Sequence, residues 1–209
     1  MANHQVKKRP TIEQVLNALE RQILFGKTYL GISQGLLHAE PVVYGTASIF
    51  FGLTADGGLE LAAMTIARLY DRTRGSVTIP RMLLQAEAEI GSFQKGSQVP
   101  AAIIEANTIV TGLESVLTAI KHYRDGWFAH LDAATVADPQ ALNAAVKVTL
   151  VDLYQAFDQT EKIIKKLTRL FDGRTGPIEF VGNDDFRQVL KHVRRSREAE
   201  MEQFRKATI

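Results

Sequence analysis

Residues 121–132 read KHYRDGWFAHLD and end a segment whose apolar residues recur at helical spacing. On a straight helix these apolar residues fall within roughly 40° of one line. They are Ile109, Leu113, Val116, Ile120, Trp127 and Leu131. The stripe is typical of a helix face turned to a core, so residues 101 to about 133 are predicted to form one long amphipathic helix. Within it, Arg124 precedes His130 with five residues between them.

The geometry of a straight helix keeps Arg124 and His130 apart. Arg124 lies about 60° to one side of the apolar line and His130 about 60° to the other, roughly 9 Å apart along the axis. Trp127 stands between them. One phosphate could meet both side chains if Gly126 permits a distortion, if Arg124 bends across, or if a second subunit completes the site. We favour a symmetric partner.

The N-terminal half of the chain is predicted to be helical throughout. The first helix is expected to start at Thr11, and a second apolar helical stretch follows Pro41 and ends near Asp71. Residues 56–58, Asp-Gly-Gly, are either a break between two helices or a weak point in one. Residues 78–90 begin with Thr-Ile-Pro, a cap followed by proline in the first turn, and predict a short helix.

The C-terminal half adds two long helices. Residues 92–100 have the composition of a loop, and a helix is expected from Asp138-Pro139 to Phe171, stopped by Asp172-Gly173. Together these elements predict a single all-α bundle over residues 10–171, a connector over 172–183 and a charged helical extension over 184–209. The extension is expected either to pack on the bundle or to project from it.

Composition excludes several classes of protein. With 209 residues and a net charge of +2, the chain is long enough for a substantial core but has no overall field that attracts nucleic acid. Cysteine is absent, which removes disulfides and thiolate chemistry and suits a reducing cytoplasm. The longest uncharged run, residues 41–55, is shorter than the roughly 20 residues that a spanning helix needs. We therefore expect a cytoplasmic protein without a membrane segment.

No known ligand-binding pattern occurs in the chain. His4, His38 and His192 have no companion residues at metal-ligand spacing, and neither of the glycine-rich nucleotide-binding patterns is present. We therefore predict no metal and no cofactor.

Three short motifs together carry a family resemblance. Residues 69–72 read LYDR at a helix end, residues 76–79 read SVTI at the next helix start, and residues 124–132 read RDGWFAHLD. Their order is similar to that of HEPN domains of the AbiU-like, abortive-infection branch, across roughly residues 10–171. The resemblance implies an antiparallel all-helical bundle that is usually dimeric. It also implies a metal-independent endoribonuclease of toxin or phage-defence type, since many HEPN domains have that activity.

The resemblance also implies roles for the two central residues. In such a ribonuclease the 2′-hydroxyl of the RNA attacks the adjacent phosphate. His130 would then be the general acid/base and Arg124 would stabilise the charge that develops on the phosphate. The implied partners are RNA as substrate, a second copy that places the site at a two-fold interface, and a cognate antitoxin. The alternative is a non-catalytic helical module that binds RNA, a nucleotide or a protein.

Five further residues are supporting candidates. Asp125 stands where the family often has asparagine; it holds Arg124 or a partner residue, or is simply solvated on the outer face, which we favour. Tyr123 and Trp127 could stack a base, although core positions fit them better. Asp71 and Arg72 are explained by capping and surface ion pairing, and the resemblance adds a role near the site.

Two surface features also have two interpretations. The last helix carries basic residues between 191 and 205, which we interpret as a solvated face with intrahelical ion pairs rather than a phosphate-binding arm. A second basic patch lies at residues 162–169. His122 points away from the apolar stripe and is expected to be exposed.

Overall fold

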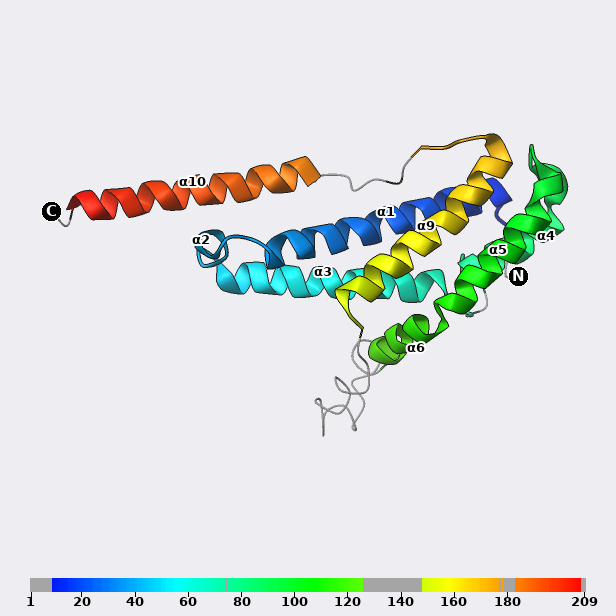
Figure 1. The fold of residues 1–209 in the computed structure, drawn as a ribbon, viewed down its shortest axis with the longest axis horizontal. Helices are drawn as coiled ribbons and strands as arrows, with labels where there is room; N and C mark the ends of the chain where they lie inside the picture. The colour runs from blue at the N-terminus through cyan, green and yellow to red at the C-terminus, as the bar shows by residue number, and fades with distance from the viewer. Residues whose placement is uncertain (1–8, 74, 126–147, 177, 179–182, 208–209) are drawn as a thin grey trace, which may run out of the picture.

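The protein is an elongated helical bundle in the computed structural model, which describes residues 9–73, 75–125, 148–176, 178 and 183–207. Within these ranges the regular structure is helical and contains no strand. Helix α1 (Ile12–Leu37) and helix α3 (Ser48–Leu69) lie side by side and antiparallel, and α9 (Leu150–Asp172) packs against both (Figure 1). The predicted all-α class is confirmed.

The first helix begins where the sequence predicts. Thr11 has an extended backbone, and its Oγ1 accepts a hydrogen bond from the Gln14 backbone N–H at 3.3 Å. The Gln14 side chain in turn accepts from the Thr11 N–H at 3.0 Å, which completes a capping box. The apolar residues that follow at helical spacing, including Leu16, Leu19 and Ile23, are all buried. The capping residue and the buried apolar face therefore both support a helix that begins just after Thr11.

The main core lies between α1, α3 and α9. Phe157 of α9 is fully buried, and its ring lies against α1 at Gly26, where an added Cβ would come within 2.3 Å of the ring. Residues of α4 (Ile79–Ala88) and α5 (Val99–Gly112), such as Met82 and Ala106, complete this core. Removing this much apolar surface from water is the main stabilising contribution to the fold.

The Asp-Gly-Gly segment at residues 56–58 does not interrupt α3. A Cβ at Gly58 would lie 2.2 Å from the Ser33 Oγ and 3.0 Å from the Tyr29 carbonyl oxygen. The glycine therefore allows a close approach of α1 and α3, and it permits tight packing instead of breaking the helix. The helical stretch predicted after Pro41 is interrupted earlier, between the short helix α2 (Pro41–Tyr44) and Ser48.

The prediction of one helix over residues 101–133 is wrong. The helical segment that ends at Gly112 meets α6 (Glu114–Tyr123) at an angle of 55°. The hydroxyls of Thr108 and Thr111 donate to the carbonyl oxygens four residues earlier, at 3.1 and 3.0 Å, and such back-bonding bends helices. The apolar stripe still faces inward across the bend, because Leu113 and Ile120 are both buried.

The segment before α5 is partly ordered into short turns. The sequence predicts a loop over residues 92–100, whereas the structure has 3-10 turns at Ile90–Ser92 and Gly96–Gln98 before α5 begins at Val99. The short helix predicted over residues 78–90 is α4, and Pro80 lies in its first turn as expected.

Helix α9 is shorter than predicted at its start. Thr149 has an extended backbone (φ −92°, ψ 163°) and forms a capping box with Asp152, so a continuous helix from residue 139 is wrong. Residues 138–147 lie outside the described residues. At the other end, Gly173 has φ +82°, the left-handed conformation that stops a helix, as the sequence predicts.

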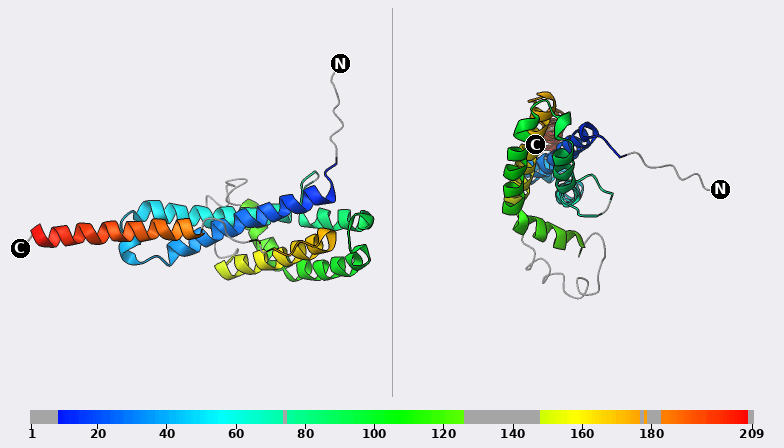
Figure 2. Two further views of the ribbon diagram at one scale, coloured as in Figure 1. Left: turned by 90° about the horizontal axis from the view of Figure 1, so that it is seen from above. Right: turned by 90° about the vertical axis from the view of Figure 1, so that its right-hand side faces the viewer.

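Helix α10 (Asn183–Ala207) both packs on the bundle and projects from it (Figures 1 and 2). Phe186, Leu190 and Val193 pack against a second apolar cluster formed by α1, α2 and α3, and Arg194 pairs with Glu40 at 2.7 Å. The C-terminal half carries intrahelical ion pairs such as Arg197–Glu200 at 2.9 Å, as predicted for a solvated charged helix. The domain limits at 171 and 184 stay a prediction.

Among the described helices, α3 by itself is long and apolar enough to cross a membrane, by length and composition. The α5–α6 region would qualify only if both arms of its bend formed one span. In α3, 39% of the apolar window is buried inside the protein. Since core helices pass the same test, this is no clear membrane-spanning signal.

Candidate functional site

A pocket of about 450 Å³ lies where the end of α3 and the start of α4 face α5 and α6. Its walls combine apolar side chains with cations, hydroxyls and two carboxylates. The lining residues are Ala67, Tyr70, Asp71, Arg72, Pro80, Val110, Thr111, Glu114, Leu117, Thr118, Lys121 and Arg124. Three predicted site residues therefore line one pocket: Asp71 and Arg72, which follow α3, and Arg124, which follows α6.

Arg124 is held in place by its neighbour Asp125. Both the Nε and the Nη2 of Arg124 contact the Asp125 Oδ1, at 2.7 and 2.6 Å, and the arginine side chain is 22% exposed. A guanidinium has five N–H donors, so this ion pair leaves the Nη1 donors for another ligand. Asp125 thus holds Arg124, one of the interpretations from the sequence, and its side chain is at the same time 44% exposed, as expected for a solvated residue.

The residues that follow α3 bring a second set of charges to the pocket. Asp71 accepts hydrogen bonds from the Thr73 backbone N–H at 3.0 Å and from the Thr73 hydroxyl at 2.8 Å. These bonds, helped by the positive charge of Arg124, hold the pKa of the Asp71 carboxyl below its usual value. Asp71 thus orders the loop after α3, and its charge also acts on Arg124 across the pocket.

Two exposed cations line the pocket together with Asp71 and Arg124. Arg72 and Lys121 both line it, and neither forms an ion pair within the part of the chain that the structure describes. Arg124 is already paired with Asp125, so Arg72 and Lys121 are the cations of the pocket that are left without an ion-pair partner among the described residues. The arrangement is suited to binding an anion, and a planar guanidinium is well matched to phosphate.

Tyr70 is a site residue that the sequence reasoning missed. Its side chain lines the pocket, while its hydroxyl lies 2.8 Å from the Thr160 Oγ1 of α9. Burial raises the pKa of Tyr70 to about 12, and the hydrogen bond to Thr160 partly opposes this. The bond ties the end of α3, and with it Asp71 and Arg72, to the bundle core. The LYDR motif contains Tyr70, so the signal was present in the sequence.

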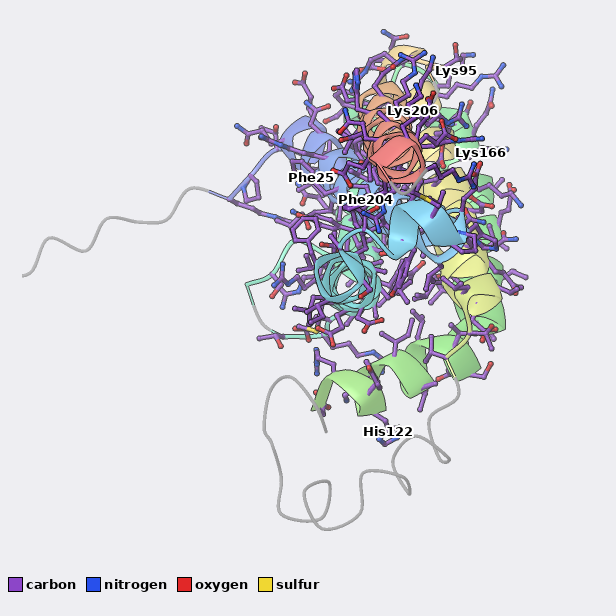
Figure 3. The ribbon with its side chains drawn as sticks, turned by 90° about the vertical axis from the view of Figure 1, so that its left-hand side faces the viewer. Phe25, Lys95, His122, Lys166, Phe204 and Lys206 are labelled. Carbon is purple, nitrogen blue, oxygen red and sulfur yellow. The ribbon has the colours of Figure 1, made fainter. Side chains whose placement is uncertain are left out.

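The remaining predicted residues are divided between the surface, the helix packing and the undescribed part of the chain. Tyr123 is half-buried, and its pKa is raised by burial and by the nearby carboxylates of Glu60 and Asp56 on α3. It does not line the pocket, which agrees better with a packing role than with base stacking. His122 is exposed as predicted and points away from the bundle in Figure 3. Trp127 and His130 lie outside the described residues.

The described residues offer no metal centre. No group of three or more His, Cys, Asp or Glu side chains in the described ranges could hold a metal ion. Among the charged groups of the pocket, Arg124 pairs with Asp125 and Asp71 accepts hydrogen bonds from Thr73.

The fold and the pocket together define an all-helical domain with a cationic site beside the end of a central helix. The family model described as AbiU2, one of the HEPN families, matches residues 41–192, and the chain belongs to that family. The matched range contains all three motifs that carried the resemblance, so the family predicted from the sequence is confirmed. The search of curated proteins and the search of solved structures each found no match.

Proposed function

We propose that the protein is a metal-independent endoribonuclease that cleaves RNA by attack of the 2′-hydroxyl on the adjacent phosphate. The observation that carries the proposal is the position of Arg124. Its guanidinium is anchored by Asp125 at the cationic end of a pocket that also contains Arg72 and Lys121. Membership of a HEPN family supports a ribonuclease or a nucleotide-related module.

In the proposed reaction the bond from the 2′-oxygen to phosphorus forms while the bond from phosphorus to the 5′-oxygen breaks. A general base takes the proton of the 2′-hydroxyl, and a general acid gives a proton to the leaving 5′-oxygen. The products end in a 2′,3′-cyclic phosphate and a 5′-hydroxyl. Arg124 stabilises the negative charge on the phosphate, and His130 moves the protons because its ordinary pKa lies near neutrality.

A second copy of the chain is part of the proposal. If residues 124–130 formed a regular helix, Arg124 and His130 would point to opposite sides of Trp127, and a second copy would bring both residue types to one phosphate. The reaction also needs both an acid and a base, and a two-fold pair of chains supplies two histidines. We therefore propose a homodimer with RNA bound across its axis, acting in the cytoplasm as a toxin or phage-defence enzyme under the control of an antitoxin.

The second candidate function is a helical module that binds RNA, a nucleotide or a protein without cleaving it. The Arg124–Asp125 ion pair is the observation that favours this candidate, since a carboxylate beside a phosphodiester is unfavourable for catalysis. Both candidates place an anion at the same pocket, and they differ in whether RNA is cut.

The test is RNA cleavage in the presence of EDTA by the full chain and by variants. We expect products with 2′,3′-cyclic phosphate ends from the wild type, and a rate loss of about 10²-fold or more in Arg124→Ala and His130→Ala. Arg169→Ala is the matched control, because Arg169 is exposed on α9 and does not line the pocket. Undiminished cleavage by the Arg124 or His130 variant would refute the site assignment, and no cleavage by the wild type would favour the binding module.

A further inference from the structure

The pocket has two chemically different ends. Arg72, Lys121 and Arg124 form the cationic end described above. The other end lies at the bend between α5 and α6, where Glu114 lines the pocket. Arg124 and Glu114 are ten residues apart on the helical path, which corresponds to roughly 15 Å. A nucleotide strand whose phosphate is held by Arg124 therefore has room to place a base near Glu114.

Glu114 has no partner that explains its place in the pocket. It is exposed at the start of α6, and within the described ranges it forms no ion pair or side-chain hydrogen bond. A carboxylate in the first turn of a helix is favourable for that helix, but this effect does not require a pocket. A carboxylate accepts hydrogen bonds and donates none, so at this end the pocket favours a ligand group with N–H donors.

The surroundings of Glu114 fit the flat, partly apolar shape of a base. Val110 near the end of α5 and Leu117 on α6, one on each side of the bend, line the same pocket and offer apolar contact to a ring face. Thr118 is exposed beside them and adds a hydroxyl that can donate or accept. The end of the pocket near Glu114 thus combines an apolar wall with the carboxylate of Glu114 and the hydroxyl of Thr118.

We propose that this end of the pocket binds a guanine base of single-stranded RNA and that Glu114 determines the specificity. The inference rests on the proposed function, and it adds the identity of a base beside the scissile phosphate. The two oxygens of a carboxylate match the N1–H and the 2-amino group of guanine, which are adjacent donors. Adenine and cytosine place a ring-nitrogen acceptor beside their amino group, and uracil flanks its N3–H with two carbonyl oxygens. Neither arrangement offers two donors to one carboxylate.

Equilibrium binding of the four nucleoside 5′-monophosphates to the full-length wild-type chain tests the proposal without requiring cleavage. We expect guanosine 5′-monophosphate to bind more tightly than the other three, by on the order of tenfold, the usual value of a good bidentate contact to a base. Glu114→Gln, which replaces one acceptor by a donor, should remove the preference. Glu87→Gln is the matched control, because Glu87 is exposed on α4 and does not line the pocket.

A second measurement separates this proposal from the proposed function. If the wild type cleaves RNA, sequencing of the product ends should show a guanine enriched beside the cut, and Glu114→Gln should lose the enrichment while still cleaving. Equal binding of the four mononucleotides, no binding of any, or a preference that survives in Glu114→Gln would overturn the base assignment. A guanine preference in binding without any cleavage would overturn the nuclease proposal and leave the base assignment standing.

Discussion

The core and the pocket differ in the kind of residue that forms them. The core lies between α1, α3 and α9, and the pocket lies between α3 and α6. The core residues Leu16, Ile23 and Phe157 are fully buried and apolar. The pocket is lined by partly exposed charges such as Arg124 and Lys121. The residues that stabilise the fold are therefore largely different from those that line the candidate site. Changes in the core are expected to alter stability, and changes in the pocket to alter binding and catalysis.

The largest expected effect is on the core. Phe157→Ala should lower the free energy of unfolding by about 3 to 5 kcal/mol, because it removes a fully buried ring that packs against α1 at Gly26. Urea unfolding followed by circular dichroism measures this loss. Phe25→Ala is the control, since Phe25 is 41% exposed and contacts Arg21 at the surface, so its loss should be far smaller. Equal losses in the two variants would contradict the assignment of the core.

The next effect concerns Tyr70, which joins the two regions. Its pKa is about 12 in the folded protein and about 10 in an unfolded chain, so folding favours the neutral phenol. The resulting stability is fully present below pH 10 and is lost as the pH rises from 10 to 12. The loss should be about 2 to 3 kcal/mol. Unfolding curves at several alkaline pH values measure it.

Tyr70→Phe provides the control for this alkaline effect. At neutral pH the variant should lose about 1 kcal/mol with the hydrogen bond to Thr160, and its stability should then fall less than that of the wild type above pH 10. Other tyrosines, such as Tyr154, titrate in both proteins and cancel in the comparison. An identical alkaline loss in both proteins would show that Tyr70 is not the responsible group.

The smallest effects compare two threonines that precede helices. Thr149 caps α9 through a bond to the Asp152 N–H at 3.2 Å, so Thr149→Ala should cost about 1 kcal/mol. Thr78 precedes α4, but its side chain makes no cap bond, and its buried hydroxyl has no partner among the described residues. Thr78→Val should therefore cost nothing or stabilise by up to about 1 kcal/mol. Thermal unfolding of both variants measures the contrast, and a larger loss at Thr78 would show an unseen partner.

The sequence predicts those parts of the fold that depend on local chemistry. The cap at Thr11 and the stop at Gly173 are confirmed because each depends on a few neighbouring residues. The apolar stripe through Leu113 and Ile120 correctly identifies the buried face. The bend in residues 101–133 was missed because apolar spacing reports which face is buried and not whether the axis is straight.

The candidate site could be predicted only in part for a related reason. Arg124, Asp71 and Arg72 were found because they belong to recognisable motifs, and the structure brings them to one pocket. The sequence analysis does not single out Tyr70 or Glu114. The place of Tyr70 depends on its hydrogen bond to Thr160, which is 90 residues away in the chain. The place of Glu114 depends on the α5–α6 bend, which apolar spacing does not report. The roles of Arg124 and His130 in catalysis stay predictions until cleavage is measured.

The 55° bend at Leu113 also fixes the rotational phase of α6. Helix α5 packs against α9, whereas α6 packs against α3, so the bend is where one packing partner is exchanged for another. Because each residue turns a helix by about 100°, one residue inserted or deleted at the bend would carry Lys121 and Arg124 around the axis and out of the pocket. The same rotation would also carry Ile120, which is buried in the main core, out of its position. The proposed site therefore depends on the length of the chain at this point as well as on the arginine itself.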